Sequence, residues 1–214
     1  MDPSPDITPV EHRVALCDRE RRNAHQGGVL WLTGLSGAGK TTLAFALEER
    51  LFRDGLQVYV LDGDNVRHGL NADLGFSRAD RGENIRRAGE VAALFADAGV
   101  LCIAAFISPY REDRAAARAA APGRFHEVYV RADLATCERR DPKGLYRRAR
   151  AGEIANFTAV DDIYEPPEDP SLTVDTTEND IECCIAMLVD YVRTRFQPEG
   201  GPGVSRAPAR RSQS

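Results

Sequence analysis

Short apolar runs alternate with longer amphipathic stretches along most of the chain. Apolar runs of about four to eight residues between turn residues predict strands, and apolar residues that recur every three or four positions predict helices. This pattern predicts five strands, at residues 29–33, 57–61, 100–107, 127–130 and 172–175. It predicts helices at residues 40–53, 83–98, 112–121 and 180–196, and two short helices within 134–150 that separate at Asp141-Pro142. Such alternation is typical of an α/β fold with a doubly wound, five-stranded parallel sheet.

The two ends of the chain are more polar than its middle. Residues 11–23 are heavily charged, which predicts a surface helix that is either solvated or a dimer-contact arm. Pro, Gly, Ser and Arg dominate from residue 197 onward, and such a composition does not build a core. We therefore expect a partly disordered N-terminal arm at residues 1–27, one α/β domain at 28–196 and a disordered tail at 197–214.

Composition and charge argue against several classes of protein. No apolar stretch approaches the ~20 residues that span a bilayer, and the polar N-terminus does not resemble a signal peptide, so we expect no membrane association. The net charge of −5 argues against general nucleic-acid binding. The five cysteines form no C-x-x-C pair, which indicates free thiols in a reducing cytoplasm.

A glycine-rich turn between the first predicted strand and helix carries the clearest chemistry. Gly34, Gly39, Lys40 and Thr41 have the spacing G-x-x-x-x-G-K-[ST] of a phosphate-binding P-loop. The glycines let successive backbone N–H groups point at a phosphate chain, and the helix adds the positive end of its dipole. We expect Lys40 to reach the β- and γ-phosphates of a nucleotide and Thr41 to offer its hydroxyl to Mg²⁺.

Three classes of P-loop protein compete for this sequence. A GTPase needs Asp-x-x-Gly after the third strand and Asn-Lys-x-Asp later, but the third strand ends in Phe-Ile-Ser-Pro and neither lysine follows an asparagine. A mechanical ATPase is normally longer and carries a Walker-B acid. The remaining class is a small-molecule kinase, in which a lid closes over ATP and a second substrate.

Two carboxylates follow the second predicted strand, next to the P-loop in a doubly wound sheet. Asp62 and Asp64 are placed to accept a hydroxyl proton or to hold Mg²⁺ through water. An ordinary turn with the sequence Asp-Gly-Asp is the alternative, and the position after an apolar strand favours a functional role.

The segment after these carboxylates has the residue types of a site for an anionic nucleotide. Arg67 and Arg81 supply guanidinium forks suited to an anion, and Asn84 can donate or accept at a base edge or phosphate. Phe76 and Phe157 lie in polar loops, where each is either a stacking platform for a base or a plug into the core.

Lysine is rare in this chain. Lys40 and Lys143 are the only lysines among 28 basic residues, and Lys40 belongs to the P-loop. A compact ammonium approaches a phosphate or sulfate oxygen where the wider guanidinium collides. Lys143 is therefore either a substrate-binding lysine on a corner after Asp141-Pro142 or part of a solvated charge run.

Several sequence blocks together resemble adenylyl-sulfate kinase (APS kinase). They occur in family order over most of residues 28–187, at 34–42, 61–70, 74–77, 80–87, 106–109, 141–146, 150–154 and 156–158. The resemblance implies a P-loop kinase domain with a helical lid that uses MgATP to phosphorylate the 3′-hydroxyl of adenosine 5′-phosphosulfate. The products would be PAPS and ADP. A homodimer in the cytoplasm, acting in sulfate assimilation, is also implied.

The resemblance carries site residues onto this chain. It implies an ATP site formed by Gly34, Leu35, Ser36, Gly37, Ala38, Gly39, Lys40, Thr41, Thr42 and Arg140. It implies an acceptor site formed by Asp64, Asn65, Val66, Arg67, Phe76, Arg81, Gly82, Glu83, Asn84, Ile107, Ser108, Lys143, Asn156 and Phe157. It implies catalytic roles for Lys40, Asp64 and Ser108, and Mg²⁺ binding by Thr41 and Asp62.

Ser108 matches the serine that the family labels as a phosphoserine intermediate. Phosphoryl transfer in P-loop kinases needs positioning and charge neutralisation, so we expect Ser108 only to hydrogen-bond the nucleotide. Ala159 departs from the family, which usually has glycine there, and Arg131 and Asp133 depart after the fourth strand. Two other hypotheses stay open: a kinase for another small anion, such as a sugar acid or nucleoside monophosphate, and a catalytically silent nucleotide-binding protein.

Overall fold

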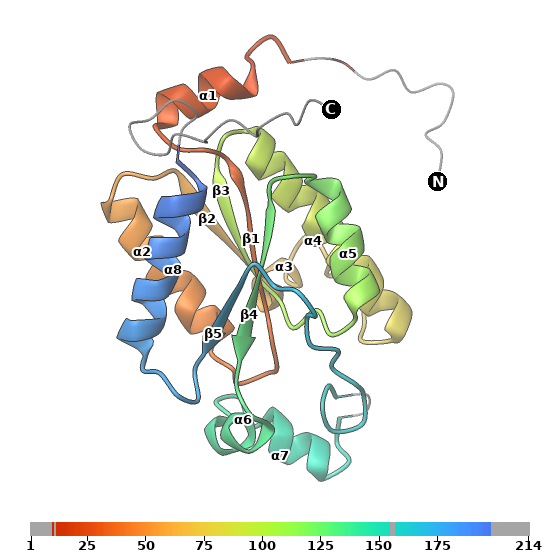
Figure 1. The fold of residues 1–214 in the computed structure, drawn as a ribbon. Coiled ribbons are helices and arrows are strands. Elements are labelled where there is room, and N and C mark those ends of the chain that lie inside the picture. The colour runs from red at the N-terminus through yellow and green to blue at the C-terminus, as the bar shows by residue number, and fades with distance from the viewer. Residues whose placement is uncertain (1–9, 11, 155–156, 198–214) are drawn as a thin grey trace, which may run out of the picture.

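The computed structural model describes residues 10, 12–154 and 157–197 and contains a five-stranded parallel sheet (Figure 1). The strands run in the order β2-β3-β1-β4-β5. Their bounds are Gly28–Thr33 for β1, Val58–Asp62 for β2, Leu101–Ala105 for β3, Phe125–Arg131 for β4 and Leu172–Asp175 for β5. The predicted doubly wound sheet is confirmed, and its strands differ from the prediction only at their ends.

Four long helices cover the two faces of the sheet (Figure 1). Helices α2 (Lys40–Arg53) and α8 (Ile181–Arg195) lie together on one face, and α4 (Arg78–Asp97) and α5 (Arg111–Ala120) lie on the other. Alternate side chains of a strand point to opposite faces. Leu30 of β1 accordingly packs in the core under α2 and α8, while Trp31 packs in the core under α4 and α5.

Helix α4 begins at Arg78, and the predicted start at residue 83 was wrong. The side chain of Ser77 accepts the N–H of Asp80, and the Asp80 carboxylate accepts the N–H of Ser77. This capping box satisfies backbone donors that the helix itself leaves open. The sequence pattern of a capping box, a serine three residues before an acidic residue, is present here and could have predicted the correct start of the helix.

The four-residue helix α3 (Gly63–Val66) was not predicted. Asp62 starts it, because its Oδ1 accepts the backbone N–H groups of Asp64 at 3.0 Å and Asn65 at 3.4 Å. The Asp62 carboxylate thus stabilises a helical turn directly after β2. This turn places Asp64 at the edge of the sheet where the P-loop lies.

Helix α1 (Leu16–Asn23) is shorter than the predicted helix at 11–23. It is attached to the domain, since Glu20 is buried, pairs with Arg124 and accepts the N–H of Gly27 at 2.9 Å. At the other end of the sheet lie α6 (Leu134–Arg140) and α7 (Leu145–Arg150), which separate where predicted (Figure 1). The expected disordered ends fall largely outside the described residues. In the described part of the chain, every helix is too short or too polar to cross a bilayer.

Candidate active site

A cavity of about 950 Å³ opens at the carboxyl ends of the strands. Strand β1 lies between β3 and β4, so the chain reverses its winding direction there, and such switch points form ligand crevices in open α/β sheets. The predicted site residues that line the cavity are Ser36, Gly37, Gly39, Lys40, Thr41, Thr42, Asp62, Asp64, Arg67, Phe76, Arg81, Asn84, Ile107, Ser108, Arg140 and Lys143.

The P-loop has the backbone conformation that its glycines predicted. Gly37 and Gly39 have φ values of +77° and +94°, a region that side chains disfavour. A Cβ at Gly37 would also lie 2.9 Å from the carbonyl oxygen of Cys137 in α6. Glycine is therefore required at residue 37 by both the backbone angle and the close approach of α6.

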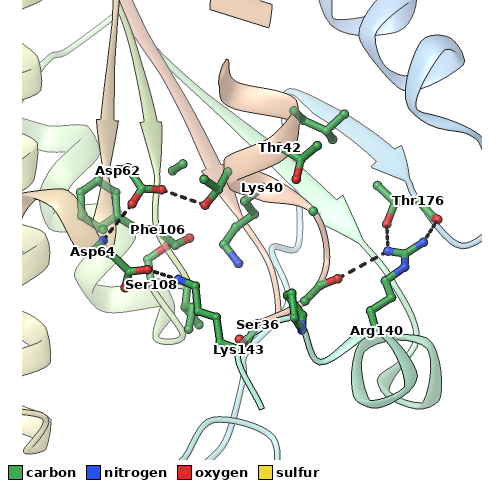
Figure 2. Close-up of a pocket in the computed structure, with 18 of the residues that line it drawn as sticks. Ser36, Lys40, Thr42, Asp62, Asp64, Phe106, Ser108, Arg140, Lys143 and Thr176 are labelled. Atoms are coloured by element: carbon green, nitrogen blue, oxygen red, sulfur yellow. Dashed lines mark hydrogen bonds and ion pairs between the residues drawn. The ribbon is translucent and has the colours of Figure 1, made fainter. Parts of the chain in front are cut away.

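Lys40 is buried at the centre of the cavity floor. Its Nζ donates to the carbonyl oxygens of Gly34 at 2.9 Å and Leu35 at 2.7 Å. Burial lowers the pKa of Lys40 to about 8, although the carboxylate of Asp62 acts in the opposite direction. Figure 2 shows the Lys40 amine between Arg140 on one side and the pair of Asp64 and Lys143 on the other. One cation thus lies where the two ends of the cavity meet.

Thr41 and Asp62 form a compact oxygen cluster beside this lysine. The Thr41 hydroxyl donates to Asp62 Oδ2 at 2.8 Å, while Asp62 Oδ1 caps α3. Mg²⁺ prefers oxygen ligands and is commonly held by one or two protein groups together with phosphates and water. The described residues contain no cluster of three or more His, Cys, Asp or Glu side chains for a metal. The Thr41 hydroxyl and the Asp62 carboxylate supply oxygen ligands of the kind and number that Mg²⁺ commonly takes from a protein.

Arg140 closes one end of the cavity and ties three segments together. Its guanidinium donates to the hydroxyl of Thr176 at 3.0 Å and to the Thr176 carbonyl at 2.5 Å. Thr176 in turn donates to the carbonyl oxygen of Ala38 in the P-loop at 2.9 Å. The lining here includes residues that the sequence analysis did not single out: Thr176, Asn179, Asp180, Ile181, Glu182 and Cys184. The one feature of the sequence that could have predicted their place in the site is that they follow the last strand, at the same edge of the sheet.

The other end of the cavity is rich in cations. Lys143, between α6 and α7, forms an ion pair with Asp64 across the cavity (Figure 2). Arg67 lies 4.4 Å over the ring of Phe76, and Arg81 donates to the Phe76 carbonyl at 3.0 Å. Burial, and then the like charge of Arg81, lower the pKa of Arg67 below its ordinary value. Cations that repel one another in this way favour an anionic ligand.

Ser108 lines the cavity but is buried within a hydrogen-bond network. Its Oγ accepts the indole N–H of Trp31 at 3.1 Å and donates to Thr33 Oγ1 at 3.0 Å. The buried guanidinium of Arg114 donates to the Ser108 carbonyl at 2.7 Å and pairs with Glu127 at 2.6 Å. The hydroxyl therefore has a donor and an acceptor inside the protein.

The structure does not bring every predicted site residue to the cavity wall. Phe157 packs in the core edge-to-face with Tyr146, with ring centroids 5.0 Å apart, whereas Phe76 is 63% exposed at the cavity. Hydrogen bonds from Arg86 and Arg87 hold Glu83 and lower its pKa to about 2. Gly34, Leu35, Ala38, Asn65, Val66 and Gly82 also lie outside the lining, and Asn156 lies outside the described residues.

A phosphate loop with a buried lysine, facing a cationic second subsite on a parallel sheet, defines a P-loop kinase of the small-molecule type. The family model described as adenylylsulphate kinase matches residues 26–175. The adenylyl-sulfate kinase of Geotalea daltonii is 59% identical over 179 residues, which cover 83% of this chain and 88% of the relative. That of Staphylococcus carnosus is 53% identical over 193 residues, or 90% of this chain and 97% of the relative.

A solved structure agrees with these relatives. The APS kinase of Mycobacterium tuberculosis in complex with AMPPNP and APS has a TM-score of 0.75 and 48% identity to this chain. The match covers 78% of this chain and 98% of that one. The chain therefore belongs to the adenylylsulphate kinase family, and the resemblance found in its motifs is confirmed.

Proposed function

We propose that this protein transfers the γ-phosphoryl group of ATP to the 3′-hydroxyl of adenosine 5′-phosphosulfate, giving PAPS and ADP. The observation that carries the proposal is that one cavity has two unlike ends, which meet at Lys40. The P-loop end suits a nucleoside triphosphate, and the cationic end, with its exposed Phe76, suits an anionic nucleotide. The M. tuberculosis relative, solved with AMPPNP and APS, supports the same pair of substrates.

In the donor end, the P-loop backbone binds the phosphate chain of ATP. Lys40 exchanges its bonds to the Gly34 and Leu35 carbonyls for phosphate oxygens and neutralises charge on the transferring group. Arg140 and Thr176 flank the nucleotide at the outer end. Thr41 and Asp62 would hold Mg²⁺, which supplies further charge neutralisation when bound.

In the acceptor end, Asp64 accepts the proton of the 3′-hydroxyl as that oxygen attacks phosphorus. Lys143 already contacts Asp64 and lies on the loop between α6 and α7, where it exchanges the carboxylate for an anionic oxygen of the acceptor. Arg67, Arg81 and Phe76 orient the acceptor nucleotide. Each of these roles is a positioning or charge role, as direct in-line transfer requires.

The homodimer implied by the resemblance stays a prediction. A cytoplasmic location is supported by the five cysteines, which are all unpaired.

A coupled assay of ADP release tests the proposed reaction. Wild-type protein with MgATP is expected to turn over with adenosine 5′-phosphosulfate, and not with its 3′-deoxy analogue, because that analogue lacks the attacking oxygen. Gluconate and AMP serve as alternative acceptors. Faster turnover with either of them than with adenosine 5′-phosphosulfate would indicate that the protein is a kinase for another small anion. Tight binding of both nucleotides in calorimetry without any turnover would instead indicate a silent nucleotide-binding protein.

A further inference from the structure

Asn71 is a completely buried polar residue in the loop between α3 and α4. Both backbone polar groups of Asn71 are hydrogen-bonded. The N–H donates to the Val66 carbonyl at 2.9 Å, and the carbonyl accepts the N–H of Leu74 at 3.2 Å. A buried amide side chain needs hydrogen-bond partners, because each unpaired polar group loses its hydration. The partners of this side chain therefore indicate what the residue is for.

The side chain of Asn71 bonds to one residue of the described chain. Its Nδ2 donates to Asn84 Oδ1 at 3.0 Å, whereas its own Oδ1 has no partner among the described residues. Reversing both amides would instead leave the NH₂ group of Asn71 without an acceptor. Buried donors without a partner are rarer than buried carbonyl oxygens without one, so the observed direction is favoured.

This direction determines which atom Asn84 presents to the cavity. Asn84 lies on α4, is 5% exposed and lines the acceptor end together with Arg67 and Arg81. Its Oδ1 faces Asn71 and accepts that hydrogen bond, so the Nδ2 group, for which no described residue is an acceptor, is the unpaired group that Asn84 offers to a ligand. A donor beside two guanidinium groups suits a phosphate, sulfate or base acceptor atom.

We propose that Asn71 is a positioning residue: it holds the Asn84 amide with its N–H donors toward the acceptor nucleotide, without touching that nucleotide itself. The inference rests on the proposed function and deepens it, since the sequence alone leaves Asn84 free to donate or to accept. Asn71 would act on the affinity for the acceptor and not on the affinity for ATP.

Calorimetry on Asn71→Leu tests this role, because leucine keeps nearly the same volume and lacks the donor. The Kd for adenosine 5′-phosphosulfate, measured with MgADP present, is expected to rise roughly tenfold, the loss of about one hydrogen bond to a charged group. The Kd for ATP should stay within about twofold. Asn84→Ala should raise the acceptor Kd by a similar factor, and adding Asn71→Leu to it should change that Kd by less than about twofold.

Asn23→Leu is the matched control, since Asn23 donates to the Gly99 carbonyl at 2.8 Å and belongs to α1, which lies at the end of the sheet opposite α6 and α7 (Figure 1). It should leave both Kd values unchanged. An unchanged acceptor Kd in Asn71→Leu, or effects of Asn71→Leu and Asn84→Ala that multiply in the double variant, would overturn the proposal. Wild-type protein that neither binds nor phosphorylates adenosine 5′-phosphosulfate would overturn the proposed function instead.

A second measurement needs no variant at residue 71. In the NMR spectrum of the wild-type protein, the side-chain amide signals of Asn84, identified by their loss in Asn84→Ala, should shift when adenosine 5′-phosphosulfate is added. The Asn71 amide protons should stay protected from solvent exchange throughout. Asn84 signals that do not move at saturation, or an Asn71 amide that exchanges freely, contradict the assignment even if Asn71→Leu does not fold.

Discussion

The two ends of the cavity are built in different ways. In the donor end, the proposed phosphate-binding groups belong to one contiguous segment, residues 34–42, whose backbone is shaped by its glycines. The acceptor end uses side chains from α3, α4, the end of β3 and the loop between α6 and α7, which hold one another by ion pairs and hydrogen bonds. Substitutions in the donor end should therefore change the rate of phosphoryl transfer. Substitutions in the acceptor end should change how the acceptor is held, except at Asp64, which lies at the boundary of the two ends and is proposed to take the proton of the attacking hydroxyl.

The largest effect is expected from Lys40→Met in the donor end. Removing the buried ammonium should lower kcat roughly 10³-fold, because Lys40 neutralises charge on the transferring phosphoryl group in the proposed reaction. The Kd for adenosine 5′-phosphosulfate should stay within a few-fold, as measured by calorimetry. Activity within a few-fold of wild type would show that this lysine does not neutralise the transferring group.

The burial of Lys40 should also affect how the free energy of unfolding depends on pH. Burial lowers its pKa from 10.5 to about 8, so between these pH values the unfolded chain binds more protons at this residue than the folded chain. The free energy of unfolding of wild type, relative to Lys40→Met, should therefore rise with pH across this window, by on the order of 3 kcal/mol. Urea unfolding of both proteins from pH 7.5 to 10.5 measures the difference. Parallel profiles would contradict the burial.

Asp64→Asn probes the boundary between the two ends. The amide cannot take the 3′-hydroxyl proton, so kcat should fall roughly 10²-fold while the Kd values of both nucleotides change little. Single-turnover kinetics at saturating substrates measure this directly. If affinity collapses while turnover at saturation holds, Asp64 is a binding residue and another group accepts the proton.

Lys143 tests whether the acceptor end needs a compact cation. Lys143→Arg is expected to lower kcat/KM for adenosine 5′-phosphosulfate nearly as much as Lys143→Ala, by about tenfold, because the guanidinium is wider than the ammonium. Thermal stability should barely change in either variant, since the Lys143 side chain is 56% exposed. A fully active arginine variant would indicate that Lys143 is only part of a solvated charge run and does not bind the acceptor.

The smallest effect on rate is expected from Ser108→Ala. Its hydroxyl is bonded to Trp31 and Thr33, so the variant should lose about 1–3 kcal/mol of stability by leaving the indole N–H unpaired. Turnover should remain within about threefold of wild type at a temperature where the variant is folded. Near-complete loss of turnover would support a phosphoserine intermediate.

The contrast between the two ends also explains what the sequence could predict. The strands, the P-loop and its glycines follow local patterns, and all were predicted. The acceptor end depends on tertiary contacts: nothing near Phe76 or Phe157 tells which ring enters the core, and the pairing of Asn71 with Asn84 joins residues with no shared motif. Helix α3 was missed because four residues are too few to show a periodicity.

The central claim is that the two ends hold ATP and the acceptor at the same time for one direct transfer. The stereochemistry at phosphorus tests it most directly, using ATP made chiral at its γ-phosphoryl group with oxygen isotopes. A single in-line transfer predicts inversion of configuration in the 3′-phosphate of the product. Retention would contradict the account, because it requires two displacements and hence a phosphorylated residue between the two ends.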